Sequence, residues 1–243
     1  MISRCLMLVY AVGAYLMALS SLVYIMGFLA DFGVHKSISS GGPEQSPWLA
    51  GLIDVCLVGL FGLQHSLTAR TSFKRWWTQL IPAPIERATY LYMTTAMTAL
   101  LLLFWQPIAI TLWEVRAPSV VIGIRVAYLG LWGVMTAATF QFGHLSFFGL
   151  AQVWAKLKHT PPTPSKLTAR YLYALARHPI SLCWMLAALV TPHLTVGHVV
   201  FAASTFVYVV LATPFEEADL VEALGAPYLE YRERTRTFVP LPK

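Results

Sequence analysis

The sequence predicts an all-α fold, a polytopic integral membrane helix bundle with five or six transmembrane helices and a cytoplasmic C-terminal segment. Of the 243 residues, 57% are apolar and 12% are charged, whereas about 25% of residues are charged in an ordinary soluble domain. The apolar residues also gather in long runs, several of which reach the roughly 20 residues that a helix needs to cross a bilayer. Because these runs take up most of the chain, we expect one domain, residues 1–243.

Six hydrophobic segments follow one another along the chain, and four of them are long enough to cross a bilayer. The fifth is short, and Pro192-His193 before Thr195 predicts a tight turn between two antiparallel helices that need not both reach the far side. Five and six spans therefore both stay open. The segments are 5–30, 48–68, 88–112, 119–149, 179–193 and 196–213.

The placement of basic residues predicts the orientation, since cytoplasmic loops are enriched in Lys and Arg. With six spans and a cytoplasmic N-terminus, 14 of the 17 basic residues lie on the cytoplasmic side, and only Lys36, Arg116 and Arg125 lie on the other. We therefore expect both termini in the cytoplasm. The formal net charge of +6 belongs to these loops, so it indicates membrane topology and no nucleic-acid partner.

The chain lacks the motifs of soluble metal and nucleotide enzymes. Cys5, Cys56 and Cys183 stand singly in apolar runs, without the spacing of a metal or redox pair. The seven histidines form no HExxH or other metal pattern, so we expect no metal. No glycine-rich phosphate loop is present, which argues against a Rossmann-type nucleotide domain.

Polar residues inside apolar segments indicate a site, because an ionisable group at the bilayer centre costs about 3 kcal/mol on insertion scales. Asp54 and His65 lie eleven residues apart, close to three helical turns, and are predicted to share a face. Gln141 and His144 are predicted to form a second patch near the cytoplasmic end of the fourth helix. We expect both patches at the depth of the charged C-terminal block.

These polar residues also have structural interpretations. Asp54 can serve as a hydrogen-bond acceptor between helices, and the patch on the fourth helix can hold neighbouring helices together. The remaining polar residues of the apolar segments are expected at the far membrane interface. These are Gln106, Arg125, His193 and His198.

Charged and aromatic residues gather in three pieces between residues 170 and 240. The prolines of 160–164 cannot continue a helix, and 165–176 is predicted to form a short interfacial helix. Pro179 suits the first helical position, where the backbone N–H groups can meet an anionic ligand group. The three pieces are residues 176–179, 216–217 and 228–231. As a structural alternative, Arg177-His178 can be a cytoplasmic anchor with Glu216-Glu217 as its ion-pair partner across the hairpin, and Tyr228 and Tyr231 can belong to an interfacial aromatic belt.

This block resembles the isoprenylcysteine carboxyl methyltransferase superfamily. Its pattern is Arg-His-Pro, a two-helix hairpin, Glu-Glu, Tyr-x-x-Tyr and an aliphatic residue before Pro. Ser181 and Cys183 depart from it, where Tyr and Gly are usual, and Thr235 stands where an aliphatic residue is common. The matching residues are Arg177, His178, Pro179, Glu216, Glu217, Tyr228, Tyr231, Val239 and Pro240.

A second set of motifs lies mainly in the front half, at residues 61–70 and 86–90, and continues at 189–192 and 195–198. In these residues the chain resembles the bacterial membrane methanethiol S-methyltransferases, in which S-adenosylmethionine methylates methanethiol to dimethyl sulfide. The resemblance implies an enzyme of the bacterial inner membrane that contacts lipid, acts on a small thiol and needs no obligate protein partner. The two likenesses together cover nearly the whole chain.

The resemblance implies that residues 170–243 bind S-adenosylmethionine. An arginine fork suits the carboxylate of this molecule, glutamates suit its ribose hydroxyls or its amine, and tyrosine faces suit its adenosine and its positive charge. The predicted cofactor residues are Tyr173, Arg177, His178, Pro179, Glu216, Glu217, Tyr228 and Tyr231.

Residues 1–169 are then expected to bind the acceptor, and the thiol needs a base or a cationic partner to become a thiolate. His65 is the predicted base, with His144 as the alternative. Gln64 and Arg70 are predicted to orient the acceptor, together with His144 if His65 is the base. Asp54 is predicted to tune the base if a residue or a water bridges it to His65.

Other functions stay open. The acceptor can be a larger lipophilic molecule, such as an isoprenylcysteine. A non-catalytic membrane transporter or assembly factor would also fit the spread of apolar segments. A sterol-reductase branch of the superfamily shares parts of the C-terminal pattern and uses NADPH.

Overall fold

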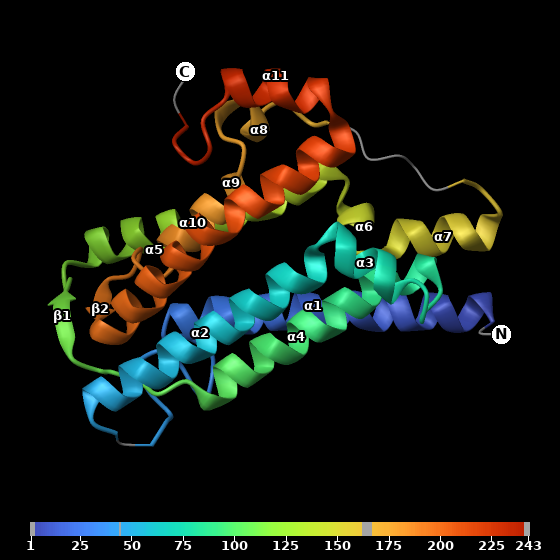
Figure 1. Ribbon diagram of the computed structural model, residues 1–243. Helices are drawn as coiled ribbons and strands as arrows, with labels where there is room; N and C mark the ends of the chain where they lie inside the picture. The colour runs from blue at the N-terminus through green and yellow to red at the C-terminus, as the bar shows by residue number, and fades with distance from the viewer. Residues whose placement is uncertain (1–2, 44, 162–166, 241–243) are drawn as a thin grey trace.

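Four long apolar helices frame the structure, a computed structural model that describes residues 3–43, 45–161 and 167–240 (Figure 1). Among the described residues, the strands form one two-stranded antiparallel sheet, β1 with β2. The elements are α1 (Arg4–Leu29), α2 (Pro47–Ala69), α3 (Thr71–Trp77), η1 (Ala83–Ile85), α4 (Glu86–Phe104), β1 (Thr111–Glu114), α5 (Pro118–Phe142), α6 (His144–Phe147), α7 (Leu150–Lys158), α8 (Leu172–Leu175), α9 (Pro179–Ala187), β2 (His193–Thr195), α10 (Val196–Leu224) and α11 (Ala226–Arg234).

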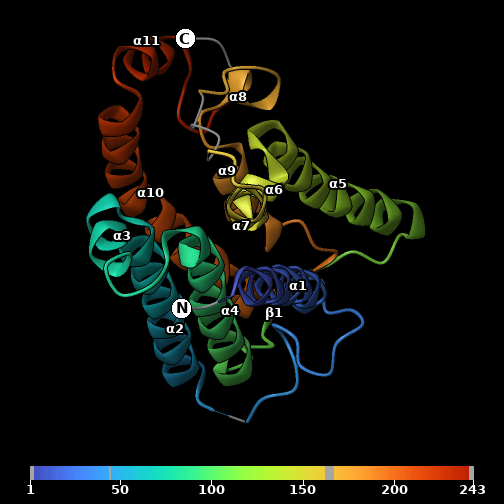
Figure 2. The same ribbon diagram turned by 90° about the vertical axis from the view of Figure 1, so that its right-hand side faces the viewer.

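Helices α1, α2, α5 and α10 are each long and apolar enough to cross a bilayer. Each exposes large apolar side chains on its outer surface, as lipid contact requires. Helix α4, of 19 residues, packs against both α1 and α2, and Figure 2 shows these three helices as one group beside α10. The prediction of a polytopic helical membrane protein is confirmed.

The predicted segment 119–149 is wrong as a single helix. Gly143 has a φ of 98°, a left-handed conformation that glycine adopts without a steric penalty and that commonly ends helices. Helix α5 therefore stops at Phe142, and His144 begins α6. Gln141 and His144 lie on different helices and do not form the predicted patch on one helical face.

Three other predicted boundaries also differ from the structure. The fifth segment is helical only to Ala187, so α9 is far too short to cross a bilayer. Helix α10 continues to Leu224, which places both glutamates of the C-terminal block inside a helix. The interfacial helix predicted for 165–176 shrinks to α8, Leu172–Leu175, and its first two residues lie outside the described part.

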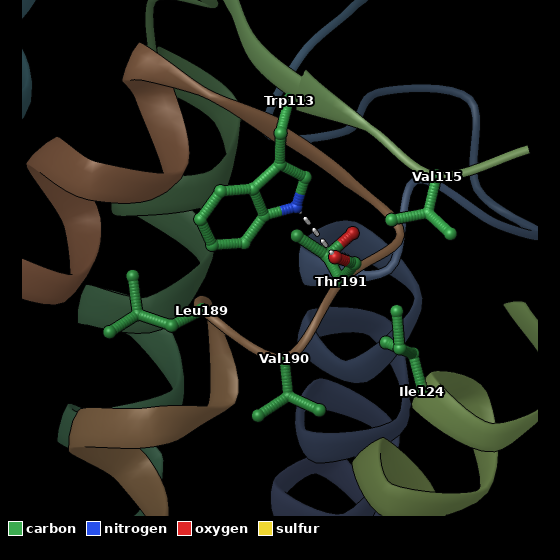
Figure 3. A pocket seen from close by; sticks show the side chains of 6 residues that line it. All are labelled: Trp113, Val115, Ile124, Leu189, Val190 and Thr191. Atoms are coloured by element: carbon green, nitrogen blue, oxygen red, sulfur yellow. Dashed lines mark hydrogen bonds between the residues drawn. The ribbon is translucent and has the colours of Figure 1, made fainter. Parts of the chain in front are cut away.

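The β1–β2 end of the bundle holds an apolar cavity of about 280 Å³. Figure 3 shows its wall, where the Trp113 Nε1–H donates to the Thr191 carbonyl at 3.3 Å. The other lining residues are aliphatic: Val115, Ile124, Leu189 and Val190. None of the residues that line it belongs to the three charged and aromatic pieces of the C-terminal block, 176–179, 216–217 and 228–231.

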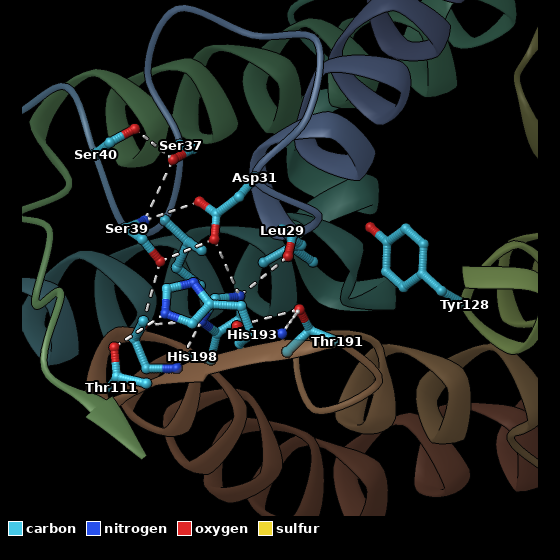
Figure 4. A network of polar contacts seen from close by, with 12 residues as sticks. Leu29, Asp31, Ser37, Ser39, Ser40, Thr111, Tyr128, Thr191, His193 and His198 are labelled. Carbon is cyan, nitrogen blue, oxygen red and sulfur yellow. Dashed lines mark hydrogen bonds and ion pairs between the residues drawn. The ribbon is translucent and has the colours of Figure 1, made fainter. Parts of the chain in front are cut away.

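Two residues expected at the membrane interface are buried instead. His198 is fully buried, its Nδ1 lies 2.9 Å from the Thr195 hydroxyl, and its Nε2 lies 3.2 Å from the Leu29 carbonyl oxygen (Figure 4). It thereby joins the end of α1 to the start of α10. Gln106 is also buried, and its backbone N–H donates to Asp54 at 2.8 Å.

Asp54 is fully buried in α2 near the β1–β2 end. Eleven residues of helix separate it from His65, which is about 16 Å along the axis. Among the described residues, its carboxylate accepts a hydrogen bond from the backbone N–H of Gln106. This geometry matches the structural interpretation, an acceptor between α2 and the segment after α4.

We expect Asp54→Ala to lower the free energy of unfolding by about 1–3 kcal/mol, because the buried Gln106 N–H loses its acceptor. Asp54→Asn keeps an oxygen at this position and should retain most of the stability. Thermal unfolding in detergent measures both variants. Equal destabilisation by the two substitutions would show that the charge of the carboxylate matters, and not its oxygen acceptor.

Candidate functional site

The C-terminal block is organised by a buried cluster, the clamp, formed by Arg177, His178 and Glu217. The Arg177 Nε–H donates to Glu217 Oε1 at 2.8 Å, and His178 Nε2 lies 3.1 Å from the same oxygen. The side chains of Arg177 and Glu217 are only 7% and 11% exposed. The clamp therefore fixes the entrance of α9 against the C-terminal third of α10.

The rest of the Arg177 guanidinium binds the segment after α11. Its Nη2 donates to the Thr237 hydroxyl at 2.8 Å, and its Nη1 donates to the carbonyls of Arg232 and Thr235. The backbone N–H of Arg177 also donates to the carbonyl of Arg236 at 2.9 Å. The guanidinium thus binds the chain's own groups, where the sequence predicted a ligand carboxylate.

The two adjacent glutamates have different surroundings. Glu217 is buried in the clamp, whereas the Glu216 side chain is 54% exposed and its Oε2 lies 3.6 Å from His178 Nδ1. Pro179 takes the first position of α9, as the sequence predicted. Of the acidic pair, Glu216 is the carboxylate that a cationic ligand can reach.

Three tyrosines surround the clamp from α8 and α11. Tyr228 and Tyr231 are buried, with ring centroids 5.9 Å apart, and the Tyr231 hydroxyl donates to the Tyr173 carbonyl at 2.5 Å. Burial raises the pKa of Tyr228 to about 12, helped by the Glu217 carboxylate and opposed by the Arg177 guanidinium. The Tyr228 phenol is therefore neutral at physiological pH.

The Tyr228 hydroxyl lies beside Arg177 but makes no hydrogen bond of ordinary geometry among the described residues. A buried hydroxyl without a partner costs about 1–3 kcal/mol, and a bound polar ligand would remove that cost. A cavity of about 290 Å³ adjoins the clamp. Its lining residues are Val210, Thr213, Pro214, Glu217, Arg232, Thr237 and Phe238.

His65, near the end of α2, is held from α4. The Tyr90 hydroxyl lies 2.9 Å from His65 Nε2 and 3.2 Å from Nδ1, and the Thr94 hydroxyl lies 3.4 Å from Nδ1. The Phe61 ring stacks on the imidazole at a centroid distance of 5.4 Å. The guanidinium of Arg87 lies 4.5 Å from the centre of the Tyr90 ring, which brings a positive charge to this group.

The two predicted orienting residues of α2 have separate contacts. The Gln64 side-chain amide donates to the Thr68 hydroxyl at 3.1 Å, and its buried oxygen has no described hydrogen bond. The Arg70 Nε–H donates to the Ser66 carbonyl at 3.1 Å. Its Nη1 lies 3.5 Å from the Asp219 carboxylate, so Arg70 links α2 to α10.

His144 lies in a different environment. Its Nδ1 is 2.8 Å from the Thr139 hydroxyl, and its Nε2 is 3.0 Å from the Tyr15 hydroxyl. Because Thr139 donates its own proton to the Thr136 carbonyl, the Nδ1–H of His144 must donate to Thr139, and Nε2 accepts from Tyr15. Both nitrogens are engaged, and no described contact joins His144 to His65.

Sequence reasoning gave no role to the residues around His65. Arg87 and Tyr90 belong to the motif at 86–90, but their spacing alone does not show that they face α2. Tyr208 and Asp219 of α10 contact α2 through Ser66 and Arg70. The sequence signal that could have pointed to Tyr208 is that it carries a polar hydroxyl within an otherwise apolar segment.

Comparison with known proteins identifies the family. The chain is 39% identical to the methanethiol S-methyltransferase of Pseudomonas sp. (strain GM41(2012)), over 96% of this chain and 89% of the relative. The chain belongs to the methanethiol S-methyltransferase family. It is also 40% identical to the Crocosphaera subtropica protein of that name, over 98% and 93%, and 36% identical to that of Mycobacterium tuberculosis, over 98% of each. The protein is thus a methyltransferase. Neither a protein-family model nor a solved structure matches it.

We expect Arg177→Lys to loosen the C-terminal segment, because lysine lacks the planar fork that bonds Glu217, Thr237 and two carbonyls at once. Limited trypsin digestion should cleave after Arg232 to Arg236 several times faster, and the substitution leaves the number of trypsin sites unchanged. Arg116→Lys alters an exposed pair with Glu114 and is the matched control. Equal cleavage of both variants would contradict the role of the clamp.

Proposed function

We propose that this methyltransferase transfers a methyl group from S-adenosylmethionine to methanethiol, giving dimethyl sulfide. The observation that carries the proposal is the similarity, over nearly the full length, to proteins named methanethiol S-methyltransferase. The described residues around the clamp and His65 have the chemistry that the two halves of this reaction need.

The residues around the clamp suit S-adenosylmethionine, which when bound supplies an electrophilic methyl group on a sulfonium. The accessible Glu216 carboxylate suits the positive charge of this molecule, and the unpartnered Tyr228 hydroxyl suits one of its polar groups. The rings of Tyr173 and Tyr231 can line the adenosine. We assign Arg177, His178 and Glu217 the role of holding these groups in place, with Pro179 starting α9 beside them.

His65 is the proposed base of the acceptor half. The Tyr90 hydroxyl lies closer to Nε2, at 2.9 Å, than to Nδ1, at 3.2 Å. Nδ1 has a further contact only with the Thr94 hydroxyl, at the longer distance of 3.4 Å, so Nδ1 is the nitrogen proposed to take the thiol proton. The sulfur lone pair would then form the new bond to the methyl carbon while the bond from that carbon to the donor sulfur breaks and leaves its electron pair on the donor sulfur. The positive charge of Arg87 near the Tyr90 ring favours the thiolate, and Gln64 and Arg70 orient the acceptor.

We further propose that the whole chain is one membrane domain, with residues 1–169 forming the acceptor side and 170–243 the donor side. Helix α4 would add a fifth span to the four clear ones, and the short helix α9 would form a hairpin with α10. Helices α3, α7 and α11, which carry many of the basic residues, lie away from the β1–β2 end (Figure 1). This arrangement supports cytoplasmic termini in the bacterial inner membrane.

Purified protein in detergent, supplied with methanethiol and S-adenosylmethionine, is expected to release dimethyl sulfide, measured in the headspace gas. Prenylcysteine is supplied in a parallel reaction as the larger acceptor. A folded protein that binds S-adenosylhomocysteine and methylates prenylcysteine alone would refute the small-thiol acceptor.

His65→Gln is expected to lower kcat for dimethyl sulfide by about 100-fold or more, the usual contribution of a general base. The dissociation constant of S-adenosylhomocysteine, measured by calorimetry, should stay within about twofold. His144→Gln is the matched control, because His144 has both nitrogens engaged by α5 and α1. A larger loss of kcat in the control than in His65→Gln would make His144 the base.

A further inference from the structure

Tyr208 of α10 packs against the backbone of α2 at Gly62. A Cβ atom at Gly62 would lie 2.4 Å from Tyr208 Cδ2 and 2.8 Å from Cε2 and Cγ. Carbon atoms in contact stay about 3.5–4.0 Å apart, so no larger residue fits while the tyrosine ring keeps its place. Because Gly62 has no side chain, it leaves the space that the Tyr208 ring occupies.

The hydroxyl of the same tyrosine reaches the next turn of α2. It lies 3.3 Å from the Ser66 hydroxyl, and Ser66 directly follows His65 in the chain. Tyr208 thus contacts two residues on one face of α2, at positions i and i+4. The adjoining face of α2 carries His65, which contacts α4 through Tyr90.

Tyr208 also stands on the helix that carries the donor half. Glu216 and Glu217 follow it by about two turns of the continuous helix α10. Tyr208 and the two glutamates therefore belong to one continuous helix, which contacts α2. Nearer the end of α10, the Arg70–Asp219 pair at 3.5 Å adds a second link between α2 and α10.

We infer that Tyr208 is a positioning residue, which sets His65 on α2 at a fixed place relative to the donor half on α10. The inference rests on the proposed function and adds to it residues with no assigned role: Tyr208, Gly62 and Ser66. Methyl transfer requires the attacking sulfur, the methyl carbon and the leaving sulfur to lie in line. A misplacement of about 1 Å can cost on the order of 100-fold in rate.

A matched pair exists elsewhere in the bundle. A Cβ at Gly13 of α1 would lie 2.5 Å from the Tyr92 hydroxyl oxygen on α4, and that hydroxyl donates to the Tyr10 carbonyl at 3.1 Å. Tyr92→Phe and Gly13→Ala therefore remove or crowd a glycine–tyrosine contact between two helices that carry none of the donor residues. These control variants measure how much kcat falls when a glycine–tyrosine contact between two helices is lost at a place away from the donor half.

The test compares Tyr208→Phe, Ser66→Ala and the double variant. Each single variant is expected to lower kcat for dimethyl sulfide about fivefold, the size of one hydrogen bond. The double variant should lose no more, because both changes remove the same contact. Gly62→Ala, which displaces the ring, should lower kcat further, by about 10- to 100-fold. The dissociation constant of S-adenosylhomocysteine should stay within about twofold throughout, and the control pair should keep its kcat.

A second measurement needs no acceptor. Hydrogen exchange of the α2 peptide around residues 62–70 is followed with and without S-adenosylhomocysteine. In the wild-type protein the ligand should slow exchange in α2 through Tyr208, whereas in Tyr208→Phe this protection should be lost. Tyr92→Phe should keep it.

The two measurements separate the inference from the proposed function. A wild-type protein that forms no dimethyl sulfide but shows ligand-dependent protection of α2 would refute the acceptor and support the coupling. The inference is overturned if Tyr208→Phe keeps both wild-type turnover and protection, or if Tyr92→Phe loses as much kcat. It is also overturned if Tyr208→Phe weakens S-adenosylhomocysteine binding as much as it lowers kcat.

Discussion

The C-terminal part of the structure, the proposed donor half, depends on one buried ion pair, between Arg177 at the entrance of α9 and Glu217 within α10. Removing two charges from water is costly, and their attraction compensates only when further hydrogen bonds satisfy both groups. Here His178, the Thr237 hydroxyl and two backbone carbonyls supply those bonds. The clamp consequently connects three stretches of chain: the start of α9, the C-terminal third of α10 and the turn after α11.

The helical twist explains why two adjacent glutamates have different surroundings. Successive residues of an α-helix point about 100° apart, so only one of the pair can face the clamp. Glu217 points into it, and Glu216 is left accessible beside His178. A single dipeptide on a continuous helix thus supplies both a structural carboxylate and a carboxylate that a cation can reach.

Helix α2 carries His65 of the proposed acceptor half and contacts both α4 and α10, the second of which carries the glutamates of the proposed donor half. One of its faces meets α4 through His65, Tyr90 and Thr94, and another meets α10 through Gly62 and Ser66. At the opposite end of the bundle, Asp54 and His198 accept or donate buried hydrogen bonds that close the loops near β1 and β2. The polar residues of the spans therefore divide into groups that close loops at one end and groups with a proposed catalytic or binding role at the other.

The sequence by itself determined the class of the fold and the family. Apolar runs long enough to cross a bilayer indicate membrane-spanning helices without any knowledge of how the helices pack. The family follows from the order of short motifs, which can be read along the chain. It also predicted Pro179 at the start of a helix, because proline lacks the N–H that the first turn does not use. The tertiary structure decided which polar residues meet. Arg177 faces Glu217, and Asp54 faces Gln106. These pairings join residues far apart in the chain, and helical spacing within one segment carries no information about them. The left-handed backbone of Gly143, which separates His144 from α5, is likewise not visible in the spacing of apolar residues.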